Sequence, residues 1–114
     1  MHFVRMLVFV TALCSALFAQ GSYSGTTTVP SSGNTMTLSQ PTNSSGTGTT
    51  ATSLEISDSN KTYKRNVDYT VTGLPGQNPV VEWLPGKRPA DGTKLTIAGD
   101  TAAVGSFTTS VTWS

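Results

Sequence analysis

GSFTTSVTWS, residues 105–114, is the stretch that decides the fold class of this chain. Its alternate residues Phe107, Thr109, Val111 and Trp113 fall on one side of an extended backbone. The residues between them are all serine or threonine. A period of two with one polar side predicts a single β-strand over this stretch, with one face on a core and the other in water.

Shorter stretches of the same kind occur throughout the chain, separated by clusters of Gly, Pro, Asn and Asp that are typical of turns. No window shows helical periodicity over three turns. Leu54 to Arg65 is predicted to form a hairpin around the turn sequence DSNK. The other predicted strands cover residues 25–30, 34–39, 68–73, 80–84 and 93–99, and residues 40–50 are predicted to form a loop.

Roughly seven or eight short strands with Gly/Pro-rich turns predict an all-β protein, an immunoglobulin-like antiparallel β-sandwich. The chain has one cysteine, Cys14, so the sandwich is expected to fold without a disulfide. Two sequons, beginning at Asn43 and Asn60, carry glycans only in a host that glycosylates them.

The first residues have the pattern of a secretory signal peptide. A start carrying Arg5 precedes an apolar run over residues 6–18, and small residues such as Ala19 follow. We therefore expect residues 1–19 to be a signal peptide and the protein to be secreted or held at the cell surface. Residues 20–50 form a Ser/Thr/Gly-rich segment with one or two strands, and residues 51–114 form the main part of a single sandwich domain.

Removal of residues 1–19 leaves a neutral chain. Of seven Lys and Arg, Arg5 is removed, so six basic side chains balance six acidic ones. A neutral surface argues against nucleic-acid binding and against attachment to anionic lipid. The only histidine, His2, and the only cysteine are removed too. Ser-His-Asp and Cys-His catalysis and an ordinary zinc site are thereby excluded, so we expect no enzyme, cofactor or metal.

The middle third of the chain carries a recognisable residue pattern. Asn66 lies two residues before the pair Asp68-Tyr69, and the sequence PADGT follows a short strand that ends near tryptophan. The pattern positions are Tyr63, Asn66, Asp68, Tyr69, Trp83, Pro89, Gly92 and Thr93. This pattern resembles β-sandwich modules of bacteriophage tail-fibre and baseplate proteins and of bacterial surface repeats, in which the position of Asn66 is usually glycine. The resemblance implies an assembly or adhesion role without catalytic residues.

The stretch RNVDYTV, residues 65–71, is predicted to form a structural corner. Asn66 tolerates a left-handed backbone and is expected to turn the chain. Asp68 is expected to accept backbone N–H groups, as in an Asx-turn, so that Tyr69 enters the next strand.

Carboxylates are the remaining source of chemistry. A glycosidase needs two of them, about 5–10 Å apart. Glu82 is the strongest candidate, although strand alternation predicts that it points into solvent. Oxygen ligands for calcium are offered by residues 58–60, or by Asp91 with Asp100, but neither set is a complete ligand loop.

Aromatic residues suggest either a core or a sugar-stacking platform. Trp83 and Trp113 share strand faces with valines, so core packing is predicted for both. Tyr23 and Tyr63 are the candidate exposed contacts, because Tyr23 lies in the polar segment that we expect to be flexible.

We therefore expect a secreted, noncatalytic structural or adhesive protein, as a fibre or surface-assembly subunit. Its expected partners are other surface proteins or further copies of itself, with residues 20–30 added as a strand to a neighbour's sheet edge. The alternative is a carbohydrate-binding module that uses exposed aromatic rings, with a glycan as its partner.

Overall fold

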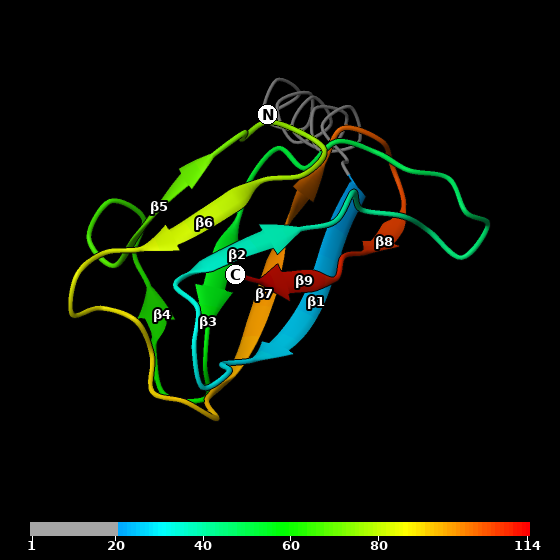
Figure 1. Ribbon diagram of the computed structural model, residues 1–114. Coiled ribbons are helices and arrows are strands. Elements are labelled where there is room, and N and C mark those ends of the chain that lie inside the picture. The colour runs from blue at the N-terminus through cyan, green and yellow to red at the C-terminus, as the bar shows by residue number, and fades with distance from the viewer. Residues whose placement is uncertain (1–20) are drawn as a thin grey trace, which may run out of the picture.

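The computed structural model describes residues 21–114 (Figure 1). The expected signal peptide over residues 1–19 lies outside the described residues. Within the described part the chain forms nine β-strands and no helix. Nothing in residues 21–114 therefore has the length and hydrophobicity of a helix that could cross a membrane.

The strands form two sheets. Sheet A has five strands in the order β4-β3-β7-β1-β8, and sheet B has four in the order β5-β6-β2-β9. Figure 1 shows sheet B in front of sheet A, with the strands of the two sheets crossing. The strand bounds are β1 Gly21–Thr28, β2 Thr35–Leu38, β3 Glu55–Ser57, β4 Thr62–Tyr63, β5 Tyr69–Thr72, β6 Val80–Trp83, β7 Lys94–Thr101, β8 Ser106–Thr108 and β9 Val111–Trp113.

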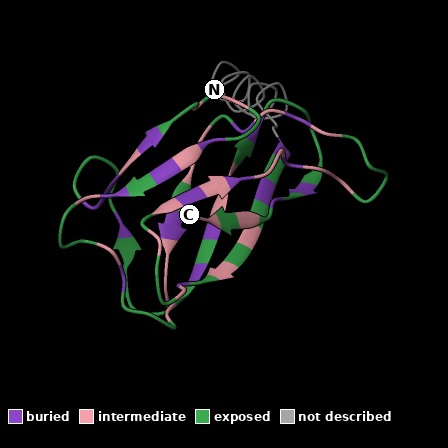
Figure 2. Ribbon diagram, viewed as in Figure 1, coloured by how far each residue is buried: buried purple, intermediate pink, exposed green. Residues whose placement is uncertain are grey.

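The core lies between the two sheets. Along the strands, buried and exposed residues alternate, as Figure 2 shows. Leu95 and Ile97 of β7 belong to one core cluster with Met36 of β2 and Val81 and Trp83 of β6, and each of these residues is at most 1 % exposed. Because the two faces of each strand differ so clearly, a slip of one residue in any pairing would bury polar side chains and expose apolar ones.

The predicted fold class, an all-β sandwich without a disulfide, is confirmed. The structure has one strand more than the upper number expected. One pairing also departs from the antiparallel arrangement, because β8 runs parallel to β1 in sheet A. The predicted hairpin between residues 54 and 65 is present as β3 and β4, which pair antiparallel.

The prediction of one continuous strand over residues 105–114 is wrong. The chain changes sheets at Thr109, so β8 belongs to sheet A and β9 to sheet B. Backbone N–H of Thr109 donates to the carbonyl of Ser24 in β1, at 3.0 Å. The hydroxyl of Thr109 donates to the carbonyl of Ser39, next to β2, at 2.8 Å. These two bonds hold the crossover, and both halves still direct their larger side chains inward.

The described part of the Ser/Thr-rich segment, residues 21–50, belongs to the sandwich. β1 lies between β7 and β8, with antiparallel pairing from Gly21–Thr101 to Thr28–Lys94. The expectation that this segment is a flexible arm is therefore wrong, because β1 is paired with β7 along its whole length and with β8 from Ser22 to Ser24. Adding β1 to a neighbour's sheet would first require opening sheet A.

Candidate functional site

The corner over residues 64–69 carries the chain from β4 in sheet A to β5 in sheet B. Asn66 has φ of 67°, and its N–H donates to the carbonyl of Tyr69 at 2.6 Å. The Asp68 carboxylate accepts the N–H of Lys64 at 2.8 Å, and the Asp68 N–H donates to the Lys64 carbonyl at 2.8 Å. The three residues that the sequence singled out are thus bonded within one turn.

Asp68 is buried at this corner, with 8 % of its surface exposed. Its carbonyl also accepts the N–H of Leu84, just after β6, at 3.0 Å. A buried carboxylate is costly unless it is hydrogen-bonded, so this geometry fits a structural group. It does not offer the carboxylate to a substrate.

Three aromatic residues form a cluster next to the corner. The ring of Trp83 contacts that of Tyr63 at 5.3 Å and 80°, and that of Tyr69 at 5.6 Å and 70°, both edge-to-face. All three side chains are buried. The indole Nε1 of Trp83 is buried without a hydrogen-bond partner among the described residues. The ring is therefore held by packing alone, which agrees with the predicted core role.

Tyr63 belongs to this cluster and not to an exposed platform. Its hydroxyl donates to the Asp58 carboxylate at 2.5 Å, across the β3–β4 turn. Burial raises the pKa of Tyr63 to about 12, and the hydrogen bond and negative charge of Asp58 act in the same direction. The hydrogen bond from Tyr63 is the main cause that lowers the pKa of Asp58, followed by the N–H of Asn60.

Tyr23 was expected to be an exposed contact, and this prediction is wrong. Its side chain is 2 % exposed and points into the core from β1. Its hydroxyl donates to the Ser53 carbonyl at 2.7 Å. Burial, then the charges of Tyr69 and Asp100, raise the pKa of Tyr23 to about 12. The ring fits because Gly99 opposite has no side chain, and a Cβ there would lie 2.6 Å from the ring.

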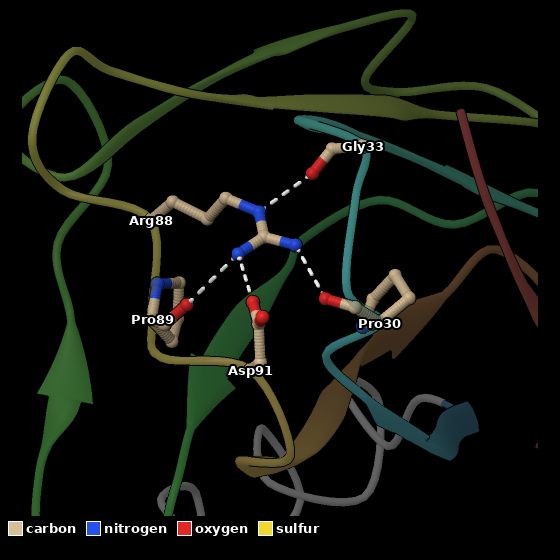
Figure 3. Close-up of polar contacts among 5 residues, drawn as sticks. All are labelled: Pro30, Gly33, Arg88, Pro89 and Asp91. Atoms are coloured by element: carbon tan, nitrogen blue, oxygen red, sulfur yellow. Dashed lines mark hydrogen bonds and ion pairs between the residues drawn. The ribbon is translucent and has the colours of Figure 1, made fainter.

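Arg88 holds together two loops that are distant in sequence (Figure 3). Its Nε donates to the Gly33 carbonyl at 2.6 Å and an Nη donates to the Pro30 carbonyl at 2.6 Å. The other Nη forms an ion pair with Asp91 at 2.8 Å. The guanidinium also lies 5.8 Å from the centre of the Trp113 ring. The residue thus fastens the β6–β7 loop to the β1–β2 loop and to β9.

The sequence offered no local signal for this role of Arg88. The carbonyls of Pro30 and Gly33 lie 58 and 55 positions earlier in the chain. The ion pair with Asp91 and a long hydrogen bond to the Pro89 carbonyl, at 3.5 Å, are local. A guanidinium with several donors in a fixed plane suits such a junction, which a lysine could not reproduce.

The carboxylates proposed for chemistry do not come together. Glu82 is exposed, and its cross-strand neighbours on β6 are Thr35 and Thr70, so no second carboxylate faces it. Asp91 precedes β7 and Asp100 lies near its other end, a separation of about 25–30 Å for an extended strand. Within residues 21–114 no group of three or more His, Cys, Asp or Glu is placed to hold a metal.

A shallow depression of about 530 Å³ lies where β3 leaves β7. Its polar side chains include those of Ser22, Ser24, Ser53, Glu55 and Asp100. Ser53 and Asp100 bond each other, through the serine hydroxyl donating to the carboxylate at 3.2 Å and the Asp100 N–H donating to the serine at 2.9 Å. The side chains of Ser53 and Asp100 are therefore used in the local structure.

The two sequons lie in different settings. The Asn43 side-chain oxygen accepts the N–H groups of Ser45 and Thr47, so this amide organises its own loop. Asn60 is exposed at the tip of the β3–β4 hairpin, where its N–H donates to the Asp58 carboxylate.

Hydroxyl groups dominate the outer faces of both sheets. On sheet B the outward residues include Thr35, Thr37, Thr70, Thr72 and Thr112. Among the described residues, the only exposed large hydrophobic side chains are Val67 and Val104. The outer faces of the described sandwich are thus polar, with hydroxyl groups around four charged side chains, those of Glu55, Glu82, Lys94 and Asp100.

No family model, curated protein or solved structure matches this chain. The resemblance to tail-fibre and surface modules therefore stays a resemblance of residue pattern. What the structure supports is the coarser statement that the chain forms a two-sheet β-sandwich.

Proposed function

We propose that this chain is a secreted, noncatalytic β-sandwich protein with an extracellular structural or adhesive role, as a subunit of a fibre or other surface assembly. One observation carries the proposal. Sheet B ends in β5 and β9, and neither edge strand contains a charged residue. Uncharged sheet edges are the places where strands of other chains add.

The uses of the acidic side chains also support a structural role. Asp58 is bonded by the β3–β4 turn and by Tyr63, Asp68 by the corner, and Asp91 by Arg88. A catalytic acid or base must instead be within reach of a substrate proton. The leader-like residues 1–19 and the resemblance to surface modules favour an extracellular setting.

No observation on the described residues favours the alternative function, a carbohydrate-binding module. It requires at least two aromatic faces exposed in one row. Tyr23, Tyr63, Tyr69 and Trp83 are all buried. Trp113 is partly buried and engaged by Thr27 and Arg88.

Expression of the full chain in a secreting host tests the proposal. We expect the protein in the medium or on the cell surface, and we expect the purified protein to self-associate or to be retained on intact cell envelopes. Fractionation and sedimentation would measure these properties. A protein that stays inside the cell, or one that is monomeric at every concentration and retained on no surface, would reject the proposed role.

A further inference from the structure

We infer that the edges of sheet B are the assembly surface: β9 of one copy pairs antiparallel with β5 of the next, which joins copies into an open-ended filament. This inference rests on the proposed function and names the partner, a second copy of this chain. It replaces the route expected from the sequence, because β1 is already paired with β7 along its whole length and with β8 from Ser22 to Ser24.

The two edges of sheet A are protected against such pairing. β4 has only two residues, and exposed Lys61, Lys64 and Arg65 flank it. Charged residues and short strands are the usual devices that block edge pairing. At the other edge, Thr42 pairs with Thr108 of β8 through two backbone hydrogen bonds of 2.9 Å. Strand addition to sheet A is thus opposed by charged residues at the β4 edge and by the paired loop residue Thr42 at the β8 edge.

The edges of sheet B are also short, but they are free of charge and of a covering loop along most of their length, since only Tyr69 at the start of β5 is bridged, by Arg65 of the corner. Residues 69–73 and 109–114 contain no charged side chain and no proline. The pairings β5–β6, β6–β2 and β2–β9 are all antiparallel. After three antiparallel steps, β5 and β9 run in opposite directions. A second copy shifted sideways without rotation therefore brings its β5 antiparallel to β9 of the first.

The backbone of β9 presents hydrogen-bonding groups at its outer edge. Toward β2, Ser114 N–H donates to Thr35 and Ser39 N–H donates to Ser110. Because bonding sides alternate along an antiparallel strand, Val111 and Trp113 direct their N–H and C=O groups to the other side. Within residues 21–114 no strand pairs with that side of β9.

The outer edge of β5 also presents backbone N–H and C=O groups, from every second residue of the strand. Leu84 N–H donates to Asp68, so the alternate residues Thr70 and Thr72 bond β6. Tyr69 and Val71 then face outward, and the Tyr69 carbonyl is already taken by Asn66. Val71 is therefore the residue of β5 whose N–H and C=O are both directed to the open edge.

The edges formed by β5 and β9 match in two ways. The residues that offer backbone hydrogen-bonding groups at the open edge point their side chains inward on both strands, and the residues between them point outward. Val71 on β5 and Trp113 on β9 point inward, and Thr72 and Thr112 point outward. If Val71 lies opposite Trp113 in a hydrogen-bonded pair, Thr72 lies opposite Thr112 in a non-hydrogen-bonded pair. The joint then repeats the outward pair that Thr37 and Thr112 already form within the chain. In this register, hydrogen-bonded and non-hydrogen-bonded pairs alternate between the two copies as they do between neighbouring strands within sheet B.

The two surfaces are different, so the contact is heterologous and does not close on itself. Such contacts generate filaments when each subunit repeats the same shift. Both edge strands are short, so each joint contains few hydrogen bonds. We therefore expect association that is weak in dilute solution and grows with concentration.

Disulfide trapping in the full chain tests the register. A Cys14→Ser background leaves only the introduced thiols, and Thr72→Cys and Thr112→Cys each replace an exposed outward side chain. Opposite residues in a non-hydrogen-bonded pair have Cα atoms about 4.5 Å apart, within the range that a disulfide spans. Under air oxidation at high protein concentration, the double variant is expected to give a ladder of covalent oligomers. Mixing the two single variants is expected to give dimers.

Thr96→Cys with Thr112→Cys is the matched control, since Thr96 is exposed on the outer face of the central strand β7. A ladder as strong in the control, or no crosslinks in the test variants, would overturn the inference. Dimers of Thr72→Cys alone or Thr112→Cys alone would also overturn it, because they require symmetric edges. If the unmodified chain self-associates while the trapping fails, the proposed function survives and this interface does not. If the unmodified chain stays monomeric, self-assembly is rejected as well.

Discussion

The indole Nε1 of Trp113 donates to the hydroxyl of Thr27 at 2.8 Å, and this bond joins the last strand of sheet B to the inner strand β1 of sheet A. The two residues lie 86 positions apart in the sequence. The bond fixes the inward direction of the Trp113 ring, next to the edge that we assign to assembly.

Trp113→Phe is expected to lower the free energy of unfolding by about 1–2 kcal/mol, because it removes this hydrogen bond and some buried ring area. A double-mutant cycle with Thr27→Val, measured by denaturant unfolding, should give a coupling of about 0.5–1.5 kcal/mol. Strict additivity of the two substitutions would show that the bond contributes nothing.

Arg88→Ala is expected to lower the free energy of unfolding by about 2–3 kcal/mol. It leaves the carbonyls of Pro30 and Gly33 without their charged donor. Arg88→Lys should recover only part of the loss, because a single ammonium cannot donate to both carbonyls in the same plane. Lys87→Ala is the control: the side chain of this exposed neighbour forms no hydrogen bond or ion pair among the described residues, so its change should stay within about 0.5 kcal/mol. Equal losses for Arg88→Ala and Lys87→Ala would contradict the role of Arg88.

Local alternation in the sequence was enough to predict most strands. Leu95 with Ile97, and Val81 with Trp83, each face the core as a period of two requires. The crossover at Thr109 could not be predicted in this way, because the alternation is the same on both sides of it. The bonds that hold it join Thr109 to Ser24 and to Ser39, and both partners are distant in sequence, Ser39 by 70 positions.

Composition was misleading at Tyr23. Ser, Thr and Gly around this residue indicate a flexible segment, yet β1 is one of the two longest strands. Its order comes from pairing with β7, and the small Gly99 makes room for the ring. The corner residues Asn66 and Asp68 could be found from sequence because their bonds are local, whereas the partners of Arg88 are not.

Acid should weaken the β3–β4 turn through Asp58. Its pKa is lowered from 3.8, mainly by the Tyr63 hydrogen bond, so its contribution to stability is present above pH 3.8 and is lost as the pH falls through the lower folded value. The difference in stability between the unmodified chain and Asp58→Asn should therefore shrink as the pH falls below 3.8. Thermal unfolding across this range measures the difference, and a constant gap would contradict the assignment.

Alkaline pH should lower the stability of the fold through Tyr63. Its pKa is raised from 10.0 to about 12, so between these values the unfolded chain loses the proton first and stability falls as pH rises. Tyr63→Phe should therefore lose less stability over this interval than the unmodified chain, although Tyr23 and Tyr69 still titrate in the variant. Phenolate absorbance and unfolding curves recorded together would test this. Parallel pH profiles for the two proteins would contradict it.

Asp68→Ala is expected to lower the free energy of unfolding by roughly 1–2 kcal/mol, the cost of removing the partner of a buried donor. The donor is the N–H of Lys64, and the loss should loosen the corner that leads into β5. Asp68→Asn keeps an oxygen at the same place and should stay closer to the unmodified chain. If the corner positions Val71 at the open edge, Asp68→Ala should also reduce trapping between Thr72→Cys and Thr112→Cys, while Asp68→Asn should preserve it. Unchanged unfolding of Asp68→Ala would show that the carboxylate does not brace the corner.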